Sequence, residues 1–163
     1  MRRCLLAVAV PFWSLFVEEA GERAPQRAAQ VRQESGFNPS ARSPVGARGI
    51  GQHMPANWPW YVKMGWIPAD SDPWDPRMGI RAQHRLMLWL EDRLKDDSKA
   101  LAGYNCGEGG VRRAVNRARS RGLVDSPERN LWEAYLPEET RHYIHVIPEK
   151  HLPWVYRQLR RSA

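Results

Sequence analysis

Cysteine and long hydrophobic runs are scarce in this sequence. Its 163 residues contain two cysteines, Cys4 and Cys106, so at most one disulfide can form. That number excludes a disulfide-stapled scaffold and a four-thiolate zinc site. The longest apolar run extends from Cys4 to Val17, which is 14 residues interrupted by a proline. Because a membrane-spanning helix needs about 18 residues, we expect no segment of this sequence to cross a bilayer.

Acidic residues are absent from one region, since no Asp or Glu lies between Glu34 and Asp70. Over the whole chain, 25 Lys and Arg against 18 Asp and Glu give a formal net charge of +7, and 42% of the residues are hydrophobic. This composition is typical of a globular protein rather than a disordered one. A chain of this length can bury roughly 70% of its unfolded surface in one core. We therefore expect a single domain over residues 1–163.

The basic residues are densest in one short stretch of the sequence. Five arginines lie within ten positions: Arg112, Arg113, Arg117, Arg119 and Arg121. The stretch is either the solvated face of a helix or a surface that attracts an anionic polymer, such as nucleic acid, cell-wall phosphate or an outer-membrane surface. Because positive charge attracts all of these polymers, the sequence does not choose among them.

The N-terminus has two interpretations. Met1-Arg2-Arg3 followed by an apolar stretch is typical of a secretory signal. However, Glu18-Glu19-Ala20 is a poor cleavage site, because an acid stands where a small residue is preferred. Residues 1–27 therefore form either a signal-like segment or a first core helix. The core helix would use four apolar residues: Trp13, Leu15, Phe16 and Val17.

The rest of the sequence is typical of helices, and alternating strand patterns are weak throughout. One helix reaches Glu34 and ends at Gly36 and Asn38-Pro39, and a Gly/Pro-rich loop follows over residues 40–51. Asp75-Pro76 is a strong helix start, because the aspartate is an N-cap acceptor and the proline suits the first turn. Further helices are expected from Ser98 as N-cap through Tyr104, from Gly109-Gly110 to about Arg119, and from Leu136-Pro137 onward. The predicted fold class is mainly α.

Three blocks of the sequence carry a family resemblance. Residues 34–55 read ESGFNPSARSPVGARGIGQHMP, residues 102–111 read AGYNCGEGGV, and residues 136–146 read LPEETRHYIHV. In this order and spacing, the blocks resemble the soluble lytic transglycosylase family, whose catalytic domain is related to goose-type lysozyme. The resemblance extends from about Ala28 to about Ile147. It implies a single lysozyme-like helical domain with a substrate cleft.

The resemblance implies cleavage of the MurNAc-β-1,4-GlcNAc bond of peptidoglycan without addition of water. Glu34 matches the catalytic acid of the family. It protonates the glycosidic oxygen, and the resulting carboxylate then takes the proton of the MurNAc C6 hydroxyl, which closes onto C1 and leaves a 1,6-anhydro sugar. To act as an acid near neutral pH, Glu34 must hold its proton. Met54 and Tyr104 are expected to form the apolar wall that raises the pKa of its carboxyl.

The local sequence agrees with a reaction that uses one acid. Common glycosidases place two carboxyls beside the bond that is cleaved, whereas no acid lies between Glu34 and Asp70. If the N-acetyl oxygen of the substrate itself stabilises the oxocarbenium-like centre, the enzyme needs no nucleophile of its own. The alternative is a goose-type muramidase, a hydrolase in which an additional acid, Glu138 or Glu139, comes close in the fold and activates water.

Other residues match substrate-contacting positions of the family. The resemblance assigns substrate contacts to Ser43, Gln52, Met54, Tyr104, Asn105, Glu139 and Tyr143. The glycines of residues 46–51 permit positive φ and let a saccharide approach the backbone. Because aromatic faces stack on sugar rings, one or two tryptophans are expected to line glycan subsites and the others to be core. The candidates are Trp58, Trp60, Trp66 and Trp74.

Three residues depart from the family pattern. Gly51 stands where the family often has Met, and His53 stands where an aliphatic residue is usual. We expect His53 to be an exposed loop residue, with a sugar contact as the alternative. Cys106 follows the Tyr-Asn pair where a small residue is common, and we interpret it as a packing residue rather than a nucleophile.

The resemblance also implies partners and a place of action. We expect peptidoglycan glycan strands as the substrate, electrostatic attraction to the anionic cell envelope, no specific nucleic acid, no cofactor, no metal and a monomer. The protein is expected to act in the bacterial cell wall or periplasm, reached through its signal-like N-terminus or through phage lysis machinery. A phage-encoded endolysin is favoured over a bacterial remodelling enzyme. A further alternative is a non-catalytic glycan- or polyanion-binding module.

Overall fold

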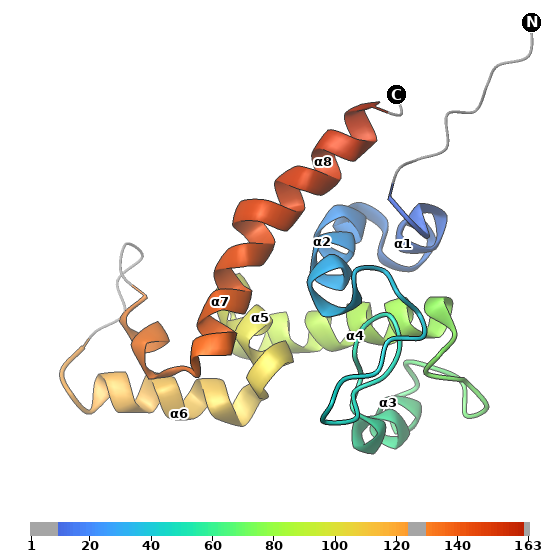
Figure 1. The fold of residues 1–163 in the computed structure, drawn as a ribbon. Coiled ribbons are helices and arrows are strands. Elements are labelled where there is room, and N and C mark those ends of the chain that lie inside the picture. The colour runs from blue at the N-terminus through green and yellow to red at the C-terminus, as the bar shows by residue number, and fades with distance from the viewer. Residues whose placement is uncertain (1–9, 124–129, 162–163) are drawn as a thin grey trace, which may run out of the picture. The chain divides into compact units, whose positions relative to one another are not determined.

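The chain is mostly helical in the computed structural model, which describes residues 10–123 and 130–161. In chain order the α-helices are α1 (Trp13–Ala20), α2 (Ala24–Ser35), α3 (Trp58–Lys63), α4 (Pro76–Leu94), α5 (Asp97–Cys106), α6 (Glu108–Arg119), α7 (Glu138–Val146) and α8 (Leu152–Arg161) (Figure 1). Shorter helical turns are η1 (Gly21–Arg23), η2 (Pro55–Asn57), η3 (Leu131–Tyr135) and the π-helical η4 (Ile147–His151). Within the described ranges, β structure is limited to two isolated bridges in the loop after α2. The predicted mainly α fold class is confirmed.

The chain divides into two compact units. Unit 1 comprises the residues up to Arg85 and those from Ile147 onward, and unit 2 comprises Leu86–Val146. Helix α4 contributes its first half to unit 1 and its second half to unit 2. The expected single domain over residues 1–163 stays a prediction.

Helix α1 packs in the core of unit 1. The Phe16 ring is fully buried and meets Phe37 edge-on at a centroid distance of 6.3 Å, and Phe37 lies 6.1 Å from Trp154 of α8. These contacts support the interpretation of a first core helix. Val17 is 47% exposed, so the expectation that it belongs to the core is wrong. Most of the signal-like segment, residues 1–9 with Cys4, lies outside the described residues.

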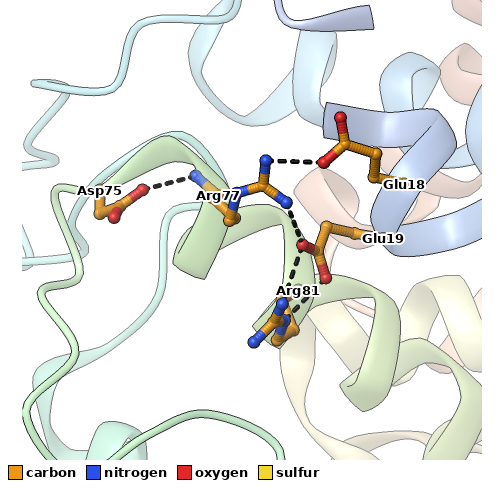
Figure 2. Close-up of polar contacts among 5 residues, drawn as sticks. All are labelled: Glu18, Glu19, Asp75, Arg77 and Arg81. Carbon is orange, nitrogen blue, oxygen red and sulfur yellow. Dashed lines mark hydrogen bonds and ion pairs between the residues drawn. The ribbon is translucent and has the colours of Figure 1, made fainter. Parts of the chain in front are cut away.

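Two acids of α1 bind two arginines of α4 (Figure 2). Arg77 donates to Glu18 at 2.6 Å and to Glu19 at 2.8 Å, and Arg81 donates to Glu19 at 2.7 Å. Burial alone would raise the pKa of the Glu19 carboxyl, but the hydrogen bonds from Arg81 and Arg77 outweigh burial and lower it. Glu19 therefore stays charged at neutral pH. The acids that make residues 18–20 a poor cleavage site thus link α1 to the start of α4.

Helix boundaries agree with the sequence signals at two sites. The helix that carries Glu34 ends at Gly36, which has a left-handed backbone (φ 60°), as expected. Helix α4 begins at Pro76, where the Asp75 carboxylate accepts a hydrogen bond from the Arg77 backbone N–H at 2.8 Å. Both boundaries are set by residues that directly flank the helix in the sequence.

The predicted start of α5 is wrong by two residues. The N-cap is Asp96, whose carboxylate accepts from the Lys99 backbone N–H at 2.7 Å, and Ser98 lies inside the helix. Asp and Ser are both good N-cap residues. Asp96 is the N-cap in the structure because its backbone is extended, as an N-cap requires. The last predicted helix begins at Glu138, directly after Leu136-Pro137.

Unit 2 packs around a buried tryptophan. Trp132 of η3 is fully buried against α5, α6 and α7, in a cluster that also contains Ala102, Val111, Ala114, Ala118, Leu136 and Ile144. The second half of α4 packs on α5 through a smaller cluster of Met87, Leu90 and Ala100. Gly103 permits this approach, because a Cβ there would lie 3.0 Å from a Leu90 methyl carbon.

We predict that Gly49→Ala destabilises the protein far more than Gly46→Ala. Both glycines have positive φ, 73° and 90°, a strain that costs alanine roughly 1–2 kcal/mol. A Cβ at Gly49 would lie 2.1 Å from the carbonyl oxygen of Pro73, whereas a Cβ at Gly46 meets nothing within 4 Å. Urea unfolding should show a loss of about 1–2 kcal/mol for Gly46→Ala and more than about 3 kcal/mol for Gly49→Ala. Equal losses would contradict the close approach at Gly49.

Candidate active site

Glu34 lies in the last turn of α2 and is half-buried. The next residue fixes this turn to the following loop, because the Ser35 hydroxyl donates to the Ile50 carbonyl at 2.8 Å. Gly36 then ends the helix, and its backbone N–H donates to the Arg32 carbonyl at 3.1 Å. The carboxyl group is thus carried by a helix end that closes at Gly36 and that Ser35 fixes to the loop.

The loop after α2 is held by its own polar side chains. The amide Nε2 of Gln52 donates to the carbonyls of Ala41 at 3.1 Å and Gly49 at 2.9 Å. The Ser43 hydroxyl accepts from the Ala47 backbone N–H at 3.0 Å. Ser43 and Gln52 therefore position the loop backbone, a role that the sequence reasoning missed. Their expected substrate contacts stay predictions.

His53 is buried, so the expectation of an exposed loop residue is wrong. The residue is 3% exposed, and its Nε2–H donates to the Gly79 carbonyl at 2.9 Å. The centroid of its ring lies 5.4 Å from that of the Tyr61 ring. Burial lowers the pKa of His53 from 6.5 to about 4, which the bond to Gly79 only partly offsets. At neutral pH the neutral imidazole thus joins the loop to the first turns of α4.

The tryptophan-rich connection forms an aromatic cluster within unit 1. Tyr61 is buried, and Trp58, Trp60 and Trp66 surround it at centroid distances of 5.9, 5.5 and 5.7 Å. The Trp58 indole N–H also donates to the Ser71 carbonyl at 3.1 Å. Three of the four tryptophans thus support one another as half-buried structural residues. Which of them contact sugar stays a prediction.

Other expected site residues differ in exposure. Met54 follows the loop and is 39% exposed, so its side chain is accessible from solvent. In unit 2, Glu139 is exposed in the first turn of α7, whereas Tyr143 is buried in the same helix. Tyr104 of α5 is half-buried and packs against the Met87 cluster.

A side-chain hydrogen bond joins the second and third sequence blocks. The Thr140 hydroxyl of α7 donates to the Asn105 side-chain oxygen at 2.7 Å, and Thr140 is buried. This bond holds the ends of α5 and α7 together near Tyr104 and Glu139. Nothing in the local sequence identifies the partner of Asn105, because the two residues lie 35 positions apart.

The environment of Cys106 supports its interpretation as a packing residue. It packs against the Trp132 cluster, and a Cβ at Gly110 would lie 2.9 Å from its sulfur. Burial raises the pKa of the Cys106 thiol. The thiol therefore stays protonated at neutral pH, and the thiolate is the form that nucleophilic catalysis needs.

The expected site residues fall into two groups, one in each unit. Unit 1 carries Glu34, Ser43, Gln52 and Met54, and unit 2 carries Tyr104, Asn105, Glu139 and Tyr143. Among the described residues, no three His, Cys, Asp or Glu side chains gather where they could hold a metal ion. No helix in the described ranges has the length and hydropathy to span a membrane.

The chain belongs to the transglycosylase SLT domain family, whose model matches residues 21–123. It is 34% identical over 131 residues to the soluble lytic murein transglycosylase of Escherichia coli, covering 77% of this chain and 20% of that protein. It is 36% identical over 124 residues to membrane-bound lytic murein transglycosylase F of Shewanella loihica, covering 71% of this chain and 25% of that protein. The chain thus spans only a fifth to a quarter of the length of these relatives.

Solved structures confirm the fold. The 70 kDa soluble lytic transglycosylase of Escherichia coli superposes with a TM-score of 0.75 and 28% identity, covering 94% of this chain and 25% of that one. A complex of a 70 kDa soluble lytic transglycosylase with bulgecin A gives a TM-score of 0.76 with 27% identity and the same coverage. The expected soluble lytic transglycosylase family and its helical fold are therefore confirmed.

We predict that the protein loses stability when the pH falls from 7.5 to 5. The folded-state pKa of His53 is lowered to about 4, so the unfolded state binds more protons between pH 6.5 and 4. The free energy of unfolding should fall by about 2 kcal/mol over this interval. In His53→Gln, which lacks the titrating ring, urea unfolding should show a much smaller fall. The same fall in both proteins would contradict this role of His53.

Proposed function

We propose that this protein is a peptidoglycan lytic transglycosylase that cleaves the MurNAc-β-1,4-GlcNAc bond. The proposal is carried by Glu34, which lies in the family-matched region and is borne by a helix end that the Ser35–Ile50 hydrogen bond fixes to the loop. The names of the relatives, lytic murein transglycosylases, support the same reaction class. The substrate is then the glycan strand of peptidoglycan.

In the proposed mechanism Glu34 serves first as acid and then as base. Its carboxyl gives a proton to the glycosidic oxygen as the bond to C1 breaks. The carboxylate then takes the proton of the MurNAc C6 hydroxyl while the oxygen of that hydroxyl bonds to C1. The proton count returns to its starting value, and the product ends in a 1,6-anhydro ring. The helix end holds one carboxyl in place for both transfers, which spares the cost of reorienting it.

The other expected site residues are proposed to hold the glycan. Tyr104 and Asn105, on the last turn of α5, and Glu139 offer polar groups. Thr140 is a positioning residue, because its hydroxyl fixes the side chain of Asn105. In unit 1, Met54 offers an exposed apolar surface, and Ser43 and Gln52 set the loop backbone whose amides can bind sugar oxygens. Tyr143 is buried and is proposed to support this surface of α7.

We further propose that the protein acts on the bacterial cell wall as a monomer. The relatives' names, which include the word murein, support the wall as the place of action. The phage origin and the route of export stay predictions.

We predict that Glu34→Gln abolishes cleavage of purified peptidoglycan and leaves the fold intact. Gln has the shape of Glu but neither gives nor takes the proton, and general acid–base catalysis contributes typically 10²–10⁴-fold. Turbidity loss of a sacculus suspension measures the rate, and the midpoint of thermal unfolding reports the fold.

Glu22→Gln is the matched control, since Glu22 is an exposed acid of unit 1 outside the candidate site. It should cleave at the wild-type rate. Cleavage by Glu34→Gln within about threefold of the wild-type rate would exclude Glu34 as the acid that carries such a factor.

A further inference from the structure

A pocket of about 200 Å³ lies in unit 2, and positive side chains surround it. Its lining contains four cations from three helices: Arg93 of α4, Lys99 of α5, and Arg112 and Arg119 of α6. Two of the five arginines of the basic stretch, Arg112 and Arg119, thus line this pocket, and Arg113 and Arg117 line a separate pocket beside Tyr135.

One carboxylate fixes two of these cations in place. Glu108 accepts from the Arg93 Nε at 2.9 Å and from the Arg112 Nε at 2.7 Å. Burial alone would raise the pKa of Glu108, but the bonds from Arg112 and Arg93 outweigh it and lower the pKa. Glu108 is thus charged at neutral pH. A single negative charge against four positive charges leaves the pocket positive, and a guanidinium held in place loses less conformational entropy on binding an anion.

The uncharged residues of the lining indicate which class of anionic ligand fits the pocket. Leu94, Val111 and Val115 supply aliphatic surface, and Asn116 supplies a polar side chain. Among the described residues that line the pocket none is aromatic, so nucleobases would find no stacking platform there. The volume suits one phosphate with a short polyol segment and is too small for the acyl chains of a lipid.

We propose that this pocket binds a phosphodiester group of a poly(glycerol phosphate) chain. Guanidinium groups match the geometry of phosphate oxygens. Because Glu108 already binds the Nε and Nη2 atoms of Arg93 and Arg112, the bidentate contact is assigned to Arg119, and the other two arginines contribute their remaining N–H groups and charge. The glycerol carbons would lie on Leu94, Val111 and Val115. The lining of the site does not include Glu34, and binding of the polymer there would hold the protein at phosphate-bearing surfaces.

The test is calorimetric titration of the 163-residue protein with a poly(glycerol phosphate) oligomer at low salt. Arg112→Gln/Arg119→Gln should weaken binding at least tenfold. The matched control is Arg113→Gln/Arg117→Gln, which removes the same charge from the same helix outside this pocket. It should change the affinity less than twofold. Equal losses in the two variants, or no loss in the first, would overturn the proposal.

Two competing anions and a single variant complete the test. A DNA oligonucleotide of equal charge and vesicles with an anionic phospholipid should bind more weakly than the oligomer. If either binds more tightly and depends on Arg112 and Arg119, the proposed ligand is wrong.

Arg119→Gln alone leaves the Glu108 ion pairs in place and should weaken binding at least threefold even if the double variant fails to fold. An unchanged affinity would overturn the proposal.

Glu34→Gln should bind the oligomer as the wild type does.

Discussion

The hydrogen bond from the Ser35 hydroxyl to the Ile50 carbonyl is the contact on which the part of the candidate site in unit 1 depends. It fastens the helix end that carries Glu34 to the glycine-rich loop. Ile50 in turn packs on Gly79 of α4, where a Cβ would lie 2.8 Å from its side chain, and His53 donates to the Gly79 carbonyl. On either side of Gly79, Arg77 and Arg81 bind the acids of α1. The helix end that carries Glu34, the loop and two further helices are thus connected within unit 1.

The helix boundaries near the site could be predicted where adjacent residues set them. Gly36 ends α2 because it adopts a positive φ, and Asp75-Pro76 starts α4 because both residues favour a first turn. His53 could not be placed in this way, because its burial depends on a carbonyl 26 residues away. Ser98 and Asp96 offer the same local signal, and only the backbone of the folded chain selects between them.

The candidate site was predicted from the three sequence blocks, and the supporting contacts were not. The blocks identify Glu34 and Asn105, whereas the bond from Thr140 to Asn105 joins residues of two helices. Likewise, the side chain of Gln52 looks available for substrate in the sequence but holds two loop carbonyls in the structure. The sequence of the basic stretch indicated its positive charge but not that the arginines line a pocket. The pocket at Arg112 and Arg119 forms where α4 and α5 bring Arg93 and Lys99 to these arginines of α6.

The mass of the products tests the single-acid mechanism most directly. Purified sacculi would be digested with the wild-type protein, reduced with borohydride and analysed by mass spectrometry. If the C6 hydroxyl attacks C1, the fragments end in 1,6-anhydroMurNAc, are lighter than hydrolysis products by one water, about 18 Da, and take up no hydrogen. Fragments that mostly take up hydrogen at C1 would contradict the mechanism. They would show a hydrolase, with Glu138 or Glu139 as the residues to test for activation of water.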